Sequence, residues 1–250
     1  MEPMQPISKG ILLLSFDDRN FVGWEAALPI FARTNAHATF FISGTMDKEA
    51  ITAMRRLSDG GHSIGLHGLT HGNADQMVAE SSPEKYFRSE ILPQLETARN
   101  AGFRITSFAY PNCRRTPESD QLFFSHGFAY VRGGLKLTPF DPDGQLADTW
   151  KPLADNPRTA FPVSDLPQRR LLNTLIVGEA YNTHIDDYLN CLKRIAECNE
   201  VLVVTSHDIA PGARFIHMKT AWLEAMLATA AELGVAVLGY NELPMPRSPI

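Results

Sequence analysis

The chain has 250 residues, of which 44% are hydrophobic and 20% charged, and its formal net charge is -5. This composition is that of an ordinary globular protein, and the length fits one large barrel or open-sheet domain, so we expect a single domain over residues 1–250. The mild acidity, without any dense Lys/Arg block, argues against a nucleic-acid partner, because such binding depends largely on neutralising phosphates.

The N-terminal segment, Met1 to Gly10, is polar and lacks the basic start and apolar run of a secretory signal. No stretch approaches ~18 consecutive apolar residues, so we expect no membrane span. The three cysteines are too few and too irregularly spaced for a disulfide framework or a Cys-ligated zinc site. The cellular compartment and the oligomeric state stay open.

Short apolar runs alternate with longer amphipathic segments along the chain, which predicts a parallel α/β fold. The first run, Ile11–Phe16, is continuous and too short for a buried helix, as is typical of a buried strand. Similar runs follow at Ala38–Ile42, Ser63–Leu66, Ser107–Ala109, Leu171–Ile176, Val201–Thr205 and Val235–Leu238. One region, Gly133–Gln168, has little periodicity and several Pro, Gly and Asp residues, which indicates a long loop within the domain.

Two adjacent carboxylates, Asp17 and Asp18, follow directly on the first predicted strand. In parallel α/β folds the carboxyl ends of the strands face the ligand, so acids at this position are candidates for catalysis. The alternative is a helix N-cap or a turn, since Asp is common at strand-to-helix junctions.

Two histidines, His67 and His71, lie four positions apart in a glycine-containing segment after the predicted strand Ser63–Leu66. A helical turn would put both imidazoles on one face, where they could bind a metal ion together with a carboxylate. The alternative is a pair of solvated loop histidines.

A third histidine, His207, follows the β-branched strand Val201–Thr205 and precedes Asp208. Histidine is the usual proton carrier near neutral pH, so His207 is a candidate acid or base. The alternative is a core histidine whose ring is satisfied by the backbone.

The order of these motifs resembles that of the polysaccharide deacetylases, carbohydrate esterase family four, which are the nodulation-protein deacetylase homologues. It comprises Ser-Phe-Asp-Asp, then His-x-x-x-His, then Phe-Ala-Tyr-Pro, then a late strand followed by His-Asp, and it runs from about Ile11 to His207. The resemblance implies a distorted (β/α) barrel with fewer than eight strands. The Phe-Ala-Tyr-Pro form resembles the branch that contains poly-N-acetylglucosamine deacetylases.

The resemblance also implies roles for individual residues. The family's general base falls on Asp17, its metal ligands on Asp18, His67 and His71, and its general acid on His207. These roles imply hydrolysis of an N- or O-linked acetyl group on a carbohydrate, with one divalent ion. A His-His-Asp set suits zinc, while cobalt, nickel, iron or manganese would fit the same ligands.

The third motif departs from the family's commonest form, because Ala109 stands where an arginine usually braces the base. Arg114 or Arg115 could supply a replacement, or either could be a surface charge. In the same segment the backbone N–H of Asn112 is a candidate oxyanion donor, and Tyr110 and Arg114 are candidate substrate contacts.

The family's Asp-Trp motif, whose acid supports the catalytic histidine, has no clear counterpart. Asp148-Thr149-Trp150 has matching residue types but lies within the predicted long loop, where Trp150 could line a sugar site or cover the core. Asp208 and Asp186 are alternative supports for His207.

Two other functions stay open on the same scaffold. One is an amidase or imidase that acts on a small molecule, for which a closed pocket would be expected in place of a long groove. The other is a catalytically silent glycan-binding protein, although such a relative would be expected to lose its base or its acid.

Overall fold

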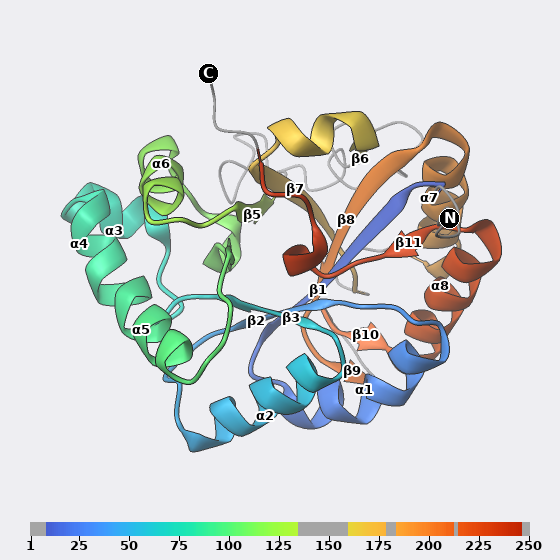
Figure 1. Ribbon diagram of the computed structural model, residues 1–250, viewed down its shortest axis with the longest axis horizontal. Helices are drawn as coiled ribbons and strands as arrows, with labels where there is room; N and C mark the ends of the chain where they lie inside the picture. The colour runs from blue at the N-terminus through green and yellow to red at the C-terminus, as the bar shows by residue number, and fades with distance from the viewer. Residues whose placement is uncertain (1–8, 135–159, 179–183, 213–214, 247–250) are drawn as a thin grey trace, which may run out of the picture.

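The computed structural model describes residues 9–134, 160–178, 184–212 and 215–246 (Figure 1). Seven parallel strands close into a barrel, because β1 pairs with β2 on one side and with β8 on the other. These strands are β1 (Ile11–Asp18), β2 (Thr39–Ile42), β3 (Ser63–Leu66), β4 (Ser107–Ala109), β5 (Tyr130–Gly134), β7 (Leu171–Ile176) and β8 (Glu200–Ser206). The expected α/β barrel with fewer than eight strands is confirmed.

Four short strands lie outside the closed ring. β6 (Ala160–Pro162) pairs antiparallel with β8, and β11 (Ala236–Val237) pairs parallel with β1. β9 (Ile209–Ala210) and β10 (Met218–Lys219) form a separate parallel pair.

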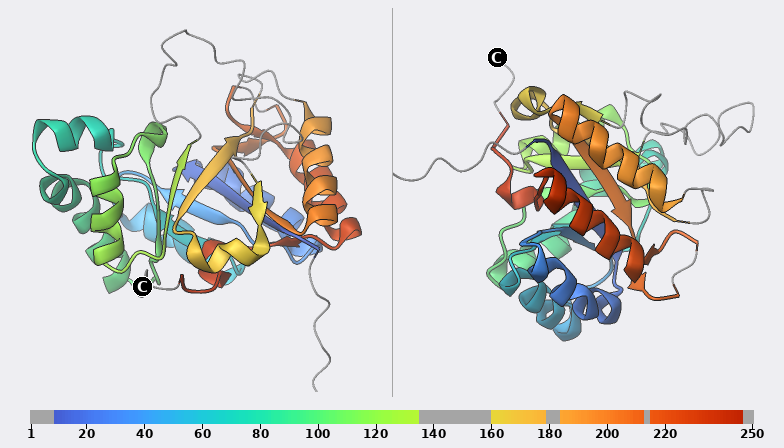
Figure 2. Two further views of the ribbon diagram at one scale, coloured as in Figure 1. Left: turned by 90° about the horizontal axis from the view of Figure 1, so that it is seen from above. Right: turned by 90° about the vertical axis from the view of Figure 1, so that its right-hand side faces the viewer.

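Helices surround the barrel, and α7 packs against α8 (Figures 1 and 2). They are α1 (Phe21–Arg33), α2 (Lys48–Asp59), α3 (Ala74–Glu80), α4 (Pro83–Tyr86), α5 (Leu92–Asn100), α6 (Pro117–Ser125), α7 (Ile185–Cys198) and α8 (Thr220–Leu233). A π-helical turn, Phe87–Ile91, joins α4 to α5. None of the described helices combines the length and apolar character needed to cross a lipid bilayer.

The predicted strands are present, with shifts at their ends, but β5 was not predicted. Its apolar residues merge in the sequence with the Gly- and Pro-rich segment after it, so the pattern gave no strand boundary there. The predicted loop Gly133–Gln168 therefore starts inside β5, and it contains β6 and a 3₁₀ turn, Val163–Gln168. Residues 135–159 lie outside the described part of the chain.

Alternate residues of β1 face two different layers, as the pleat of a strand requires. Leu12, Leu14 and Phe16 pack in the core between barrel and helices. Ile11 and Leu13 belong to the second core, inside the barrel. The same alternation carries Asp17 to the barrel side, where it is 4% exposed.

The amino ends of β2 and β3 hold a histidine that is buried for structural reasons. The Nδ1 atom of His62 accepts a hydrogen bond from the N–H of Ala38 at 3.0 Å. Its ring lies edge-on to Phe31 and Phe40. Burial, with a smaller contribution from His37, lowers the pKa of His62 from 6.5 to about 4.

We predict that His62 makes the stability of the protein depend on pH between 6.5 and 4. Because the folded-state pKa lies below the unfolded value, the unfolded chain binds the extra proton first, so stability is lost as the pH falls through this window. The contribution is about 3 kcal/mol. Urea unfolding at pH 7 and pH 4.5 measures it, and His62→Asn, which keeps an acceptor for Ala38, is expected to show a shallower loss. Equal pH slopes in the two proteins would contradict this account.

Candidate active site

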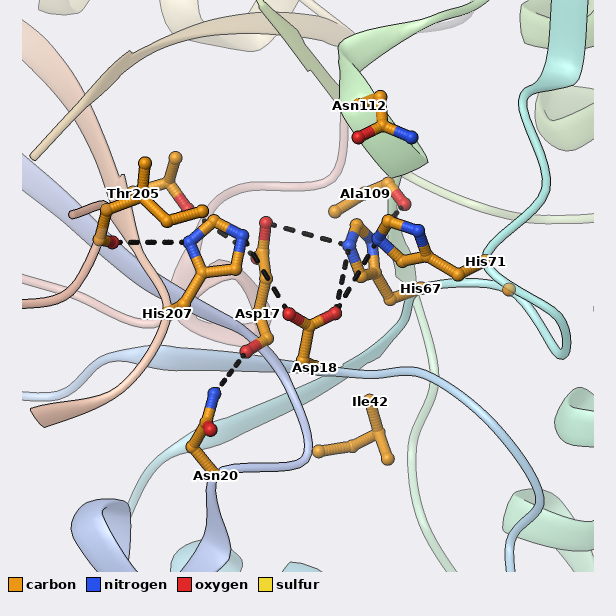
Figure 3. A network of polar contacts seen from close by, with 12 residues as sticks. Asp17, Asp18, Asn20, Ile42, His67, His71, Ala109, Asn112, Thr205 and His207 are labelled. Atoms are coloured by element: carbon orange, nitrogen blue, oxygen red, sulfur yellow. Dashed lines mark hydrogen bonds and ion pairs between the residues drawn. The ribbon is translucent and has the colours of Figure 1, made fainter. Parts of the chain in front are cut away.

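The carboxyl ends of three barrel strands bring the predicted site residues together (Figure 3). Asp17 and Asp18 end β1, His67 follows β3, and His207 follows β8. β1 pairs with β8 such that Phe16 lies opposite Ser206, so the two acids and His207 emerge side by side. This is the end of a parallel barrel at which ligands bind.

Asp18, His67 and His71 form a cluster that can hold a metal ion. Their candidate ligand atoms all lie within 4.8 Å of one another. Asp18 Oδ1 is 3.8 Å from His67 Nε2 and 3.6 Å from His71 Nε2. One carboxylate and two imidazoles are the donor set of many catalytic zinc sites, which leave further coordination positions open.

Two of these three residues have a left-handed backbone. The segment from His67 to His71 is a loop, not the helical turn that the spacing suggested, and His71 has a φ of 59°. Asp18 has a φ of 82°. Residues other than glycine rarely adopt such angles, and they cluster at functional sites where the surrounding structure holds them.

A hydrogen bond from the Nδ1 atom of His67 fixes the orientation of its imidazole ring. Nδ1 lies 2.7 Å from the carbonyl oxygen of Ala109, so it must carry a proton and donate it, which leaves Nε2 facing Asp17 and Asp18. Burial lowers the pKa of His67 well below its usual value. A neutral imidazole with a free Nε2 is the form that binds metal.

Asp17 is buried beside an arginine that the sequence did not indicate. Its Oδ2 accepts a hydrogen bond from Arg132 Nη2 at 2.5 Å, and Arg132 is 1% exposed. Burial alone would raise the pKa of Asp17, but the charge of Arg132, with smaller contributions from His67 and His207, outweighs burial and holds the pKa below its usual value. The guanidinium also lies over the ring of Phe41. Asp17 is therefore held as a carboxylate.

Arg132 contacts Asp17 in the way expected of the arginine that is missing from the third motif. It lies on β5 directly opposite Ala109 of β4, so the guanidinium enters from the neighbouring strand. The suggested replacements do not reach Asp17, because Arg114 pairs with Asp75 and Arg115 pairs with Asp120.

A sequence signal for Arg132 was available. The run Phe128–Val131 is apolar and follows a glycine typical of a helix end, so a strand that continues into Arg132 could have been inferred there, although its end could not.

His207 is oriented by a backbone carbonyl. Its Nδ1 lies 3.3 Å from the carbonyl oxygen of Ile216, and its Nε2 is 3.9 Å from Asp18 Oδ2. Trp24 Nε1–H donates to the carbonyl of His207 at 2.7 Å.

Three carboxylates were candidates to support His207. Asp148 lies outside the described residues, and neither Asp208 nor Asp186 contacts the imidazole. Asp208 accepts from the N–H of Ile209, and Asp186 is exposed in the first turn of α7. Within the described ranges, the group that contacts Nδ1 of His207 is the backbone carbonyl of Ile216.

The remaining predicted site residues differ in how far they are exposed to solvent. Asn112 is exposed in the turn Pro111–Cys113, has a φ of 52°, and donates from Nδ2 to Asn73 at 2.9 Å. Tyr110 is 1% exposed, and its hydroxyl bonds to Ser119 and Asp120, so it anchors α6 and is not available to a substrate. Trp150 lies outside the described residues.

We predict that Arg132→Met lowers the free energy of unfolding of the metal-free protein by about 3–5 kcal/mol, because it leaves a buried carboxylate without its cation. Adding Asp17→Asn should recover much of this loss, since a neutral amide needs no counter-charge. Urea unfolding of both single variants and the double variant measures the coupling. Arg114→Met, which breaks a half-buried pair with Asp75, serves as the control and should cost less because its partner stays in contact with solvent. Additive losses from Arg132→Met and Asp17→Asn would contradict the pairing.

Known proteins share this architecture. The structure resembles a family 4 carbohydrate esterase from Streptomyces lividans with a TM-score of 0.59, 14% identity, and coverage of 96% of this chain and 100% of that chain. It also resembles the catalytic domain of a peptidoglycan N-acetylglucosamine deacetylase from Eubacterium rectale with a TM-score of 0.54, 15% identity, and coverage of 98% and 95%. At these identities the likeness establishes the fold.

Sequence similarity establishes the family. A peptidoglycan deacetylase of Helicobacter pylori is 26% identical over 146 residues, which are 53% of this chain and 48% of that protein. The chain thus spans about half the length of this relative. The sequence profile of the polysaccharide deacetylases matches residues 5–131, just over half of the chain. The chain therefore belongs to the polysaccharide deacetylase family.

Proposed function

We propose that the protein is a metal-dependent hydrolase that removes acetyl groups, N- or O-linked, from a carbohydrate. The observation that carries the proposal is the meeting of Asp17, Asp18, His67, His71 and His207 at one end of the barrel. Each proposed role depends on a particular neighbouring group, and the contacts of that group support the proposal.

Asp18, His67 and His71 would hold the ion. The donor set suits zinc, and cobalt, nickel, iron or manganese would fit the same ligands. A divalent ion there supplies a Lewis acid for the acetyl carbonyl and lowers the pKa of water.

Asp17 is the proposed general base. The carboxylate is ionised because of Arg132, and it lies 3.8 Å from His67 Nε2, beside the proposed metal position. It would accept the proton of the water whose oxygen attacks the acetyl carbon. Two adjacent acids would thereby take different roles, because Asp18 would bind the ion while Asp17 contacts the arginine.

His207 is the proposed general acid. With Nδ1 committed to the carbonyl of Ile216, Nε2 is the nitrogen that faces the site. It would donate a proton to the amine nitrogen or the alkoxide oxygen as the bond to the acetyl carbon breaks, which yields acetate and the free sugar group. The backbone N–H of Asn112 is the proposed donor to the oxyanion, an effect typically worth about 3 kcal/mol per donor.

The test is acetate release from a panel of acetylated sugars by protein that has been stripped with chelator and refilled with zinc, cobalt or nickel. We expect Asp17→Asn to bind the ion but to lose about 10²–10⁴-fold in kcat, since it removes the base. His67→Ala should lose the ion itself.

Two variants control for nonspecific effects. Asp59→Asn alters an exposed acid at the end of α2, and His37→Ala alters a histidine at the amino end of the barrel. Both should keep the activity of the unmodified protein. Near-normal kcat in Asp17→Asn at saturating metal would show that the base is another group. Absence of acetate release from every sugar, despite a bound ion, would refute the deacetylase proposal.

A further inference from the structure

Glu90 is a buried carboxyl group that has no role in the proposed reaction. It is 2% exposed, and no Lys, Arg or His among the described residues forms an ion pair with it. Burying such a group is costly unless hydrogen bonds compensate for the lost water. The hydrogen-bond partners of Glu90 therefore indicate its role.

Among the described residues, the hydrogen bonds to Glu90 from outside its own helix all come from the loop between the two candidate metal-binding histidines. Thr70 donates twice to the carboxylate, from its backbone N–H to Oε2 at 2.8 Å and from Oγ1 to Oε1 at 2.8 Å. The N–H of Leu69 donates to the backbone carbonyl of Glu90 at 3.0 Å. One residue thus holds two consecutive residues of the loop.

The helix around Glu90 is adapted to this contact. Glu90 lies in the π-helical turn Phe87–Ile91, in which Leu92 N–H reaches back five residues to Phe87. Single π turns are rare in proteins, and those that occur often lie at functional sites. One turn later, Gln94 is 1% exposed and donates from Nε2 to the carbonyls of Gly44 at 2.6 Å and Gly68 at 3.2 Å. Residues 68, 69 and 70 are therefore all bound by the same helical segment.

The loop needs such support because of its backbone. His71 has a left-handed φ of 59°, which costs energy for a residue with a side chain. Thr70 immediately precedes it, so fixing the N–H and the hydroxyl of Thr70 fixes the peptide from which His71 projects. Without this restraint, His71 could relax to an ordinary conformation and its imidazole would leave the position beside Asp18 and His67.

We propose that Glu90 is a positioning residue of the candidate metal centre, whose hydrogen bonds to Thr70 hold His71 in the conformation that lets it bind the same ion as His67. This proposal rests on the metal centre proposed above. Glu90 positions His71 through the geometry of its hydrogen bonds and not through the negative charge of its carboxylate.

Two substitutions separate these causes. In Glu90→Gln the amide oxygen can still accept from the N–H of Thr70, and the amide nitrogen can donate to Thr70 Oγ1, so the geometry is kept without the charge. In Glu90→Met the volume is similar but no acceptor is left. Glu84→Met, at an exposed position of α4, is the matched control.

The first measurement is the zinc Kd by competition with a chromophoric chelator, on the full chain. Loss of an outer hydrogen bond to a ligand loop typically weakens metal binding about 10–100-fold, which we expect for Glu90→Met, with Glu90→Gln within about threefold of the unmodified protein. Thermal unfolding of the metal-free proteins shows that each variant is folded.

The second measurement does not depend on metal. Hydrogen–deuterium exchange of the peptide that covers residues 67–72 should be faster in metal-free Glu90→Met than in the unmodified protein, and unchanged in Glu90→Gln and Glu84→Met. Unchanged exchange and unchanged zinc affinity in folded Glu90→Met would overturn the proposal, and so would equal losses in the Gln and Met variants. If the unmodified protein binds no zinc or other divalent ion, the proposed metal function fails, and the exchange result still decides whether Glu90 holds the loop.

Discussion

The closure of the barrel between β1 and β8 is the constraint on which the candidate site depends. Parallel pairing of these strands places Ser206 opposite Phe16, so that His207 leaves β8 where Asp17 and Asp18 leave β1. The pairing of β1 with β2, and of β2 with β3, brings His67 to the same end. Residues far apart in the sequence thereby form one cluster, with the two acids at its centre.

Around this cluster the backbone is strained, and buried polar groups hold it in place. Asp18, His71, Asn112 and Cys113 all have positive φ angles, although none is glycine. The groups next to them are unusually well buried for their charge or polarity, since Arg132, Glu90 and Gln94 are each no more than 2% exposed. Strained residues persist only where their surroundings over-determine them. The buried polar residues at this end of the barrel therefore hold the site residues in place as well as stabilising the fold.

Sequence patterns predicted the parts of the molecule that depend on local chemistry. Continuous apolar runs identified β1, β2, β4 and β8, and acids or histidines directly after such runs identified the residues that meet at the site. Features that depend on contacts between distant segments were not accessible. The contact of Arg132 with Asp17 depends on the strand register that sets Arg132 opposite Ala109. The π turn at Glu90 has no sequence signature of its own, and Ile216 contacts His207 through a backbone atom that every residue has.

The central claim is that Asp18, His67 and His71 bind one catalytic ion. The most direct test is a crystal structure of zinc-loaded protein, with anomalous data on either side of the zinc absorption edge. The account predicts one strong anomalous peak in contact with Asp18, His67 Nε2 and His71 Nε2, and no ligand bond from Asp17, whose carboxylate stays with Arg132. A peak at another location, or a zinc ion bound by Asp17 in place of Asp18, would contradict it.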